Sequence, residues 1–141
     1  MNTRYRRLNM NISNWLSAAF LNAALRNTAF TPPTAIYLAL YTSDPTQADT
    51  GTEVSGGGYT RQAIAFAAPT IVGGMQTVKN AVDIEFPIAT ADWGLVTHIG
   101  LRTAATGGNL LWSSAIPNPR TIQTGDKPKF LKDGTVVRFT N

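Results

Sequence analysis

Few side chains in this sequence have the type and spacing needed for catalysis. His98 is the single histidine of the chain and the only candidate for a general base. Asp92 and Ser113 could be imagined as its partners in a triad, but the sequence contains no Gly-x-Ser-x-Gly elbow. Because no sequence spacing indicates a serine within hydrogen-bonding distance of the histidine, we interpret His98 as a structural residue.

Two groups of carboxylates are the remaining candidates. Asp44, Asp49 and Glu53 could offer oxygen ligands to Ca²⁺, but their spacing does not match an EF-hand loop, and a solvated acidic loop accounts for them. Asp83 and Glu85 lie on one face of a predicted strand, where such pairs usually mark the solvated side. With no cysteine and one histidine, the chain lacks the usual zinc ligand sets. We expect no catalytic residue, no metal and no cofactor.

The 141 residues are enough for one domain with one hydrophobic core. Only 14% of them are charged, a low fraction that suggests a surface partly covered by neighbours. The net charge is +4, and basic residues gather near both ends of the chain: Arg4, Arg6 and Arg7, and Lys127, Lys129 and Lys132. No nucleic-acid motif accompanies them, so we expect no specific nucleic-acid partner.

One helix is predicted, over residues 13–26. Residues 1–10 form a basic, flexible arm ahead of it, and residues 11–141 form a single β domain that includes the helix. Ser13 or Asn11 can cap the helix, and Pro32 with Pro33 prevents its continuation. An isolated helix of this length is marginal in water, so Trp15 and its neighbours must pack on their own domain or on a neighbouring chain.

The chain after Pro33 has the pattern of β structure. Predicted strands cover residues 34–42, 59–67, 82–86, 95–103, 109–115, 120–124 and 135–140, separated by Gly- and Asp-rich turns. No helical pattern intervenes, so an antiparallel β-sandwich or small barrel of seven to eight strands is predicted. No apolar run approaches the ~20 residues of a membrane span, so we expect no membrane partner.

Three segments resemble a family of small bacteriophage virion structural proteins that are often labelled tail-fibre-like. They are Y-L-A-L-Y-T-x-D-P-T (residues 37–46), E-V-x-G-G-x-Y-x-R-Q (residues 53–62) and D-W-G-x-V-T-H-I-G-L (residues 92–101). The resemblance implies a virion component, assembled in the host cytoplasm, without enzymatic activity. The arm and the lysine-rich stretch depart from the pattern of the family.

Two functions are consistent with this resemblance. The first hypothesis is a capsid decoration or cement protein, which binds the major capsid protein on the outside of the shell. The alternative is a tail or collar fibre accessory protein that takes part in host attachment and contacts tail or collar proteins; it would place aromatic residues such as Tyr37, Tyr41 or Tyr59 around an outer groove. Either protein would be a homo-oligomer, for which we predict a trimer. The predicted protein-interaction residues are Arg4, Arg6, Arg7, Trp15, Lys127, Lys129 and Lys132.

Overall fold

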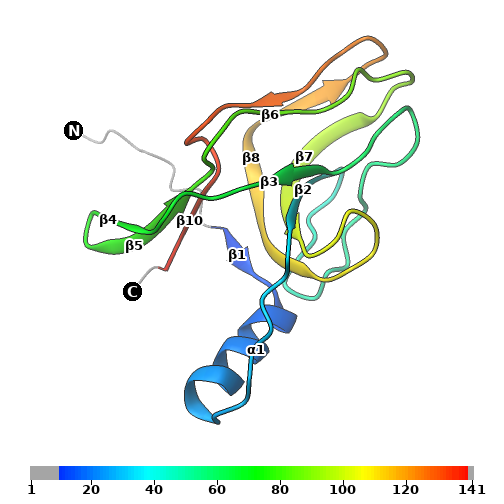
Figure 1. Cartoon of the computed structure of the whole chain (residues 1–141). Coiled ribbons are helices and arrows are strands. Elements are labelled where there is room, and N and C mark those ends of the chain that lie inside the picture. The colour runs from blue at the N-terminus through cyan, green and yellow to red at the C-terminus, as the bar shows by residue number, and fades with distance from the viewer. Residues whose placement is uncertain (1–9, 140–141) are drawn as a thin grey trace, which may run out of the picture.

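The computed structural model describes residues 10–139, which form one helix and ten strands (Figure 1). In chain order the elements are β1 (Asn11–Ile12), α1 (Asn14–Leu25), β2 (Ile36–Tyr41), β3 (Gln62–Ile64), β4 (Thr70–Val72), β5 (Met75–Lys79), β6 (Ile84–Glu85), β7 (Gly94–Arg102), β8 (Leu110–Ile122), β9 (Lys129–Phe130) and β10 (Val136–Arg138).

The strands form three antiparallel sheets. The largest has the order β1-β8-β7-β2-β3, the second has the order β10-β5-β4, and β6 pairs with β9 in a two-stranded ribbon. The prediction of a mainly antiparallel β fold behind one helix is therefore confirmed. The predicted number of seven to eight strands is too low, and the sheets of residues 10–139 do not close into a barrel.

The strands that were not predicted are short. Two of them, β1 and β9, form only because a partner distant in the sequence pairs with them. β1 pairs with β8, and β9 pairs with β6, through only two residues each. β4 and β5 form a hairpin around Gly73 and Gly74, where only a turn was predicted. In the opposite direction, the two predicted strands at 109–115 and 120–124 are joined in β8, which is 13 residues long.

β2 is buried on both faces, as its sequence predicts. Leu38 and Leu40 point into a hydrophobic core that draws side chains from all three sheets, including Ile84 of β6 and Val137 of β10. On the other face the ring of Tyr41 crosses Gly100 of β7, where a Cβ atom would lie 2.7 Å from the ring. A glycine is needed there because any side chain would push the ring off the sheet.

The predicted helix is confirmed, with Ser13 and Arg26 as its caps. The Ser13 hydroxyl accepts a hydrogen bond from the backbone N–H of Leu16 at 3.1 Å, and the Arg26 N–H donates to the Asn22 carbonyl. Leu16 is 1% exposed, so α1 packs on its own domain through this face. No helix among the described residues is long and apolar enough to span a membrane.

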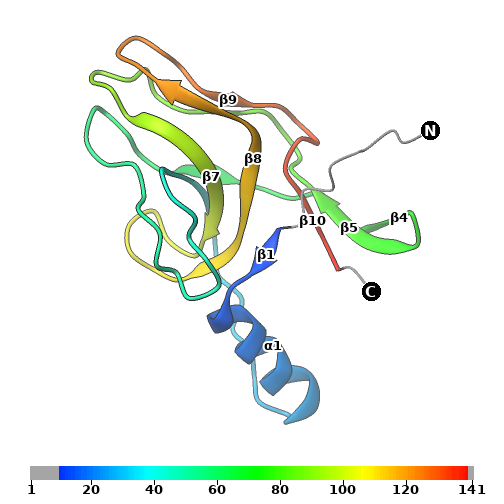
Figure 2. The same ribbon diagram turned by 180° about the vertical axis from the view of Figure 1, so that it is seen from behind.

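The helix projects from one end of the domain, and its outer face lacks a partner within residues 10–139 (Figures 1 and 2). Leu21 is 59% exposed and Leu25 is 77% exposed. α1 therefore has a buried anchor on one side and exposed leucines on the other, which is unusual for a helix that has only solvent outside it.

This difference between the two sides predicts different costs for the same substitution. Leu16→Ala removes a fully buried side chain and should lower the free energy of unfolding by about 2–5 kcal/mol. Leu21→Ala, the matched control on the outer face, should change it by less than about 1 kcal/mol in the monomer. Urea unfolding of dilute protein measures both values, and equal losses would contradict the packing described for α1.

Candidate functional site

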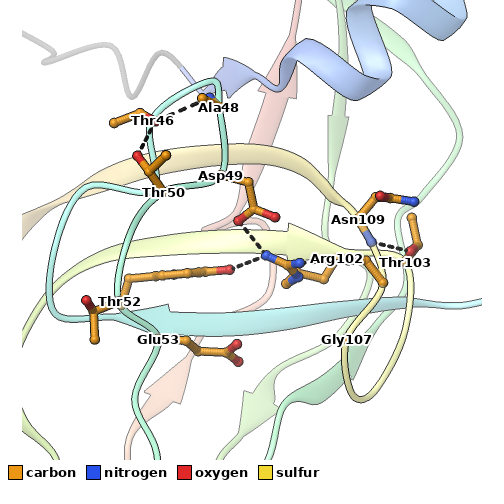
Figure 3. A network of polar contacts seen from close by, with 12 residues as sticks. Thr46, Ala48, Asp49, Thr50, Thr52, Glu53, Arg102, Thr103, Gly107 and Asn109 are labelled. Atoms are coloured by element: carbon orange, nitrogen blue, oxygen red, sulfur yellow. Dashed lines mark hydrogen bonds and ion pairs between the residues drawn. The ribbon is translucent and has the colours of Figure 1, made fainter.

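The long loop of residues 43–58 lies against the second face of β2 and is held there by an arginine of β7. Arg102 donates from Nη1 to Asp49 Oδ1 at 2.7 Å and to the Tyr41 hydroxyl at 3.0 Å (Figure 3). Its Nη2 donates to the carbonyl of Gly108 at 2.8 Å. One buried guanidinium therefore joins the acidic loop, the sheet and the β7–β8 connection.

Arg61 holds the C-terminal part of the same loop in a similar way. Arg61 forms a bidentate pair with Glu53, with both N···O distances at 2.8 Å. Its Nη1 donates to the carbonyls of Ala104 and Gly107. Tyr59 donates its hydroxyl to the same carboxylate and accepts the backbone N–H of Leu40. We call these two arginines, with Asp49 and Glu53, the arginine clamp.

Glu53 and Arg61 stay charged in the clamp. Burial opposes ionisation of Glu53, but the bonds from Arg61 and Tyr59 outweigh it and lower the pKa of this carboxyl. The bond to Glu53 raises the pKa of Arg61, and burial raises the pKa of the Tyr59 hydroxyl, which therefore stays protonated. None of these three groups, Glu53, Arg61 and Tyr59, is poised to exchange a proton near neutral pH, so their role is structural.

The loop of residues 43–58 is also ordered by hydrogen bonds between its own polar groups. The Asp44 carboxylate accepts the N–H of Thr46. The Thr46 hydroxyl meets that of Thr50 at 2.9 Å and accepts the N–H of Ala48 (Figure 3). Thr46 and Asp49 both have φ near +60°, which is costly for a threonine. These contacts hold the strained backbone in place, so the predicted solvated loop is a fixed part of the fold.

The candidate catalytic residues are not brought together. His98 Nδ1 lies 2.8 Å from the Thr97 hydroxyl, and its Nε2 lies 3.9 Å from Asp44. Asp92 instead binds Thr124, while Ser113 pairs with β1 on one side and with Gly100 on the other. The described residues contain no group of three metal-ligating side chains.

Asp83 and Glu85 form ion pairs with the lysines near the C-terminus. Lys127 binds Glu85 at 2.7 Å, and Lys129 binds Asp83 at 3.2 Å. The backbone N–H of Lys132 lowers the pKa of Asp83, and Lys127 lowers that of Glu85. A general acid at neutral pH needs a raised pKa, so this ribbon of β6 and β9 is no acid–base site.

The remaining predicted interaction residues have different positions. Arg4, Arg6 and Arg7 lie outside the described residues. Trp15 is 43% exposed at the start of α1, with its ring 6.5 Å from that of Phe30. The aromatic cluster predicted for a fibre protein does not form as proposed, because Tyr41 is buried and Tyr59 is used by the clamp.

Sequence reasoning missed the clamp, although its parts were visible. The loop carries three carboxylates and no basic residue, and Arg61 and Arg102 stand in predicted strands where charge is unexpected. An arginine within a buried strand requires an acidic partner, and the acidic loop is the richest source of one. The distances of 8 and 53 residues along the chain hid which partner each arginine takes.

The fold and these contacts define a rigid antiparallel β domain, and residues 10–139 bring no set of catalytic or metal-binding side chains together. The sequence model of a family described as podophage GP4 fiber I protein gp80 matches residues 11–138. The chain belongs to this family, which makes it a structural fibre protein of the phage virion and not an enzyme. A search of curated proteins gave no match.

The family match favours the second of the two functional hypotheses over the first. It supports a fibre protein, whereas capsid decoration, our first hypothesis, gains no support from it. The resemblance to tail-fibre-like virion proteins is confirmed.

The clamp predicts a specific response to acid. Folded Glu53 has a pKa below its ordinary value of 4.5, so below that pH the unfolded chain takes up a proton that the folded chain resists. The free energy of unfolding should therefore fall as the pH drops below about 4.5. Glu53→Gln should lose about 2–3 kcal/mol at pH 7 and show a shallower decline in acid.

Chemical unfolding measured between pH 3 and 7 tests this. Asp133→Asn serves as the control, because the Asp133 carboxylate accepts no hydrogen bond from residues 10–139. It should keep the stability and the pH profile of the unmodified chain. A Glu53→Gln profile parallel to that of the unmodified chain would show that the clamp carboxylate does not govern acid stability.

Proposed function

We propose that the chain is a subunit of a host-attachment fibre that associates with further copies of itself through the outer face of α1. The observation that carries this proposal is the exposed stripe of the helix. Asn14, Ala18, Leu21 and Leu25 follow one another at spacings of four, three and four residues, and all four are exposed. This is the spacing of the seam along which helices pack in coiled coils.

The chemistry of the stripe favours an identical partner. No residue from Asn14 to Leu25 carries a charge, so two copies of α1 can approach without repulsion. Burying a leucine side chain stabilises a contact by about 1.5–3 kcal/mol, and each copy offers two. A helix of 12 residues gives a short seam, so several copies around one axis are needed, and we keep a trimer as the proposed state.

Neighbouring residues extend this contact. Trp15 flanks the stripe and is placed at the edge of the proposed copy–copy interface. Arg4, Arg6 and Arg7 precede the helix in the sequence, and we propose that they contact tail or collar proteins. The lysine cluster is a weaker candidate for such a role, because two of its three side chains are paired with carboxylates.

The two ends of the domain support an outward-facing arrangement. α1 leaves the domain at one end, while the β6–β9 ribbon lies at the opposite end (Figures 1 and 2). If the helices gather at the fibre axis or base, the ribbon end points away from the assembly. We therefore propose that the ribbon end faces the host cell.

Replacing both leucines of the stripe tests the assembly. Leu21→Glu with Leu25→Glu should convert the oligomer to a monomer, because buried like charges on every copy repel. The control is Leu131→Glu, which places the same charge on a residue that is 63% exposed near β9. Sedimentation velocity gives the masses, and an oligomer that survives the double substitution would remove α1 from the interface.

Host attachment is tested on phage particles. Particles that lack the chain should adsorb to host cells more slowly, and supplying the unmodified chain during assembly should restore the rate. The Leu21→Glu/Leu25→Glu chain should not restore it. Normal adsorption by particles without the chain would restrict its role to fibre structure and contradict the attachment proposal.

A further inference from the structure

A groove lies at the ribbon end of the domain, between β8 and the segment that leads into β9. Its volume is about 650 Å³, within the range of small-molecule sites. The floor is apolar and is made by Leu40, Val96, Ile116, Ile122 and Phe130. The other lining residues are mostly polar: Asn118, Arg120, Thr121, Asp126, Lys127 and Lys129. A ligand in the groove would therefore meet both an apolar floor and a hydrogen-bonding rim.

An irregularity in β8 builds one wall of this groove. Val96 of β7 is paired with Arg120 of β8, but His98 is paired with Ala115, so Thr97 alone faces residues 116–119. Pro117 and Pro119 lie in this bulge and have no N–H to give to the sheet. Bulges of this kind redirect side chains and are frequent beside functional sites. Here the bulged segment and Arg120 contribute to the groove lining.

Arg120 is the free charge of the rim. The two lysines of the rim, Lys127 and Lys129, are paired with Glu85 and Asp83 of β6. The Asp126 carboxylate accepts the N–H of Gln123. No hydrogen bond or ion pair within residues 10–139 involves the Arg120 guanidinium, which therefore offers its whole donor set to a ligand.

We propose that this groove binds an acidic sugar unit of a host-surface polysaccharide, with Arg120 on the carboxylate. The inference rests on the proposed attachment function and names its ligand class. The apolar face of a sugar ring fits against Ile116 and Phe130. Asn118 and Thr121 supply hydrogen-bond partners for the ring hydroxyls.

The lining favours a saccharide over other acidic ligands. Six of the twelve lining residues are polar and six are apolar, which suits a ring that has one apolar face and a hydroxylated edge. An acyl chain would leave the polar rim unsatisfied. An acidic peptide would gain most from several free cations, and the groove has one, since its lysines are already paired.

Binding of defined oligosaccharides to the full chain tests the proposal. The probes are tetramers of α-1,4-linked galacturonate, the same tetramers as methyl esters, and oligomers of N-acetylneuraminate. Isothermal titration calorimetry gives the affinities, and backbone amide NMR shifts locate the site. We expect binding of at least one acid probe, shifts centred on residues 116–122 and 127–130, and loss of binding on esterification of the galacturonate tetramer when that is the probe bound.

Three variants test whether binding depends on the groove or on the overall charge of the protein. Arg120→Gln should weaken acid-probe binding by about tenfold or more, the usual effect of losing a charged hydrogen bond. Arg26→Gln, the matched control at the helix end, should change it less than about twofold. Asn118→Ala should weaken binding of an acid probe without altering net charge.

Several outcomes would overturn the proposal. They are no binding of either acid probe at millimolar concentration, equal effects of Arg120→Gln and Arg26→Gln, or equal binding of a tetraglutamate peptide. Self-association and adsorption report on the proposed function separately. If both persist and the sugars do not bind, the groove proposal alone is wrong.

Discussion

The fold depends on two arginines that bring charge into the sheet and neutralise it there. Arg61 and Arg102 each join a carboxylate of the 43–58 loop to carbonyls of the β7–β8 connection. These contacts keep the loop over β2, where it covers the ring of Tyr41 and the second face of the strand. Most strands here are short and stabilise one another weakly, so β2, an inner strand covered on both faces, gives the domain much of its rigidity.

The chain has few charged residues, and most of its carboxylates are paired with groups of the chain itself. Seven of the eight carboxylates accept a hydrogen bond or ion pair from the chain itself: Asp44, Asp49, Glu53, Asp83, Glu85, Asp92 and Asp126. The helix α1 carries no charge at all. A monomer would expose this helix to water at a cost, which the proposed assembly would remove.

Local signals allowed part of this structure to be predicted from sequence. The helix was found from Ser13 and the apolar spacing after it, and β2 and β7 from runs of strand-forming residues that end at turns. β1 and β9 were missed because two residues carry no period, and only distant partners make them strands. The clamp and the bulge at 116–119 were missed for the same reason, since register and ion pairing over long separations have no local pattern. Motif resemblance gave the virion class, but the choice between shell and fibre depends on outer surfaces that such motifs do not describe.

The helix and the groove have complementary roles in the proposed fibre. A groove with one free arginine and an open rim can hold a single sugar unit only weakly. Copies joined through α1 present several such grooves on rigid domains, and a surface polysaccharide repeats its units along the chain. Each further contact then forms at a high effective concentration, so avidity replaces affinity. In this arrangement the exposed leucines of the helix determine how strongly the opposite end of the molecule binds.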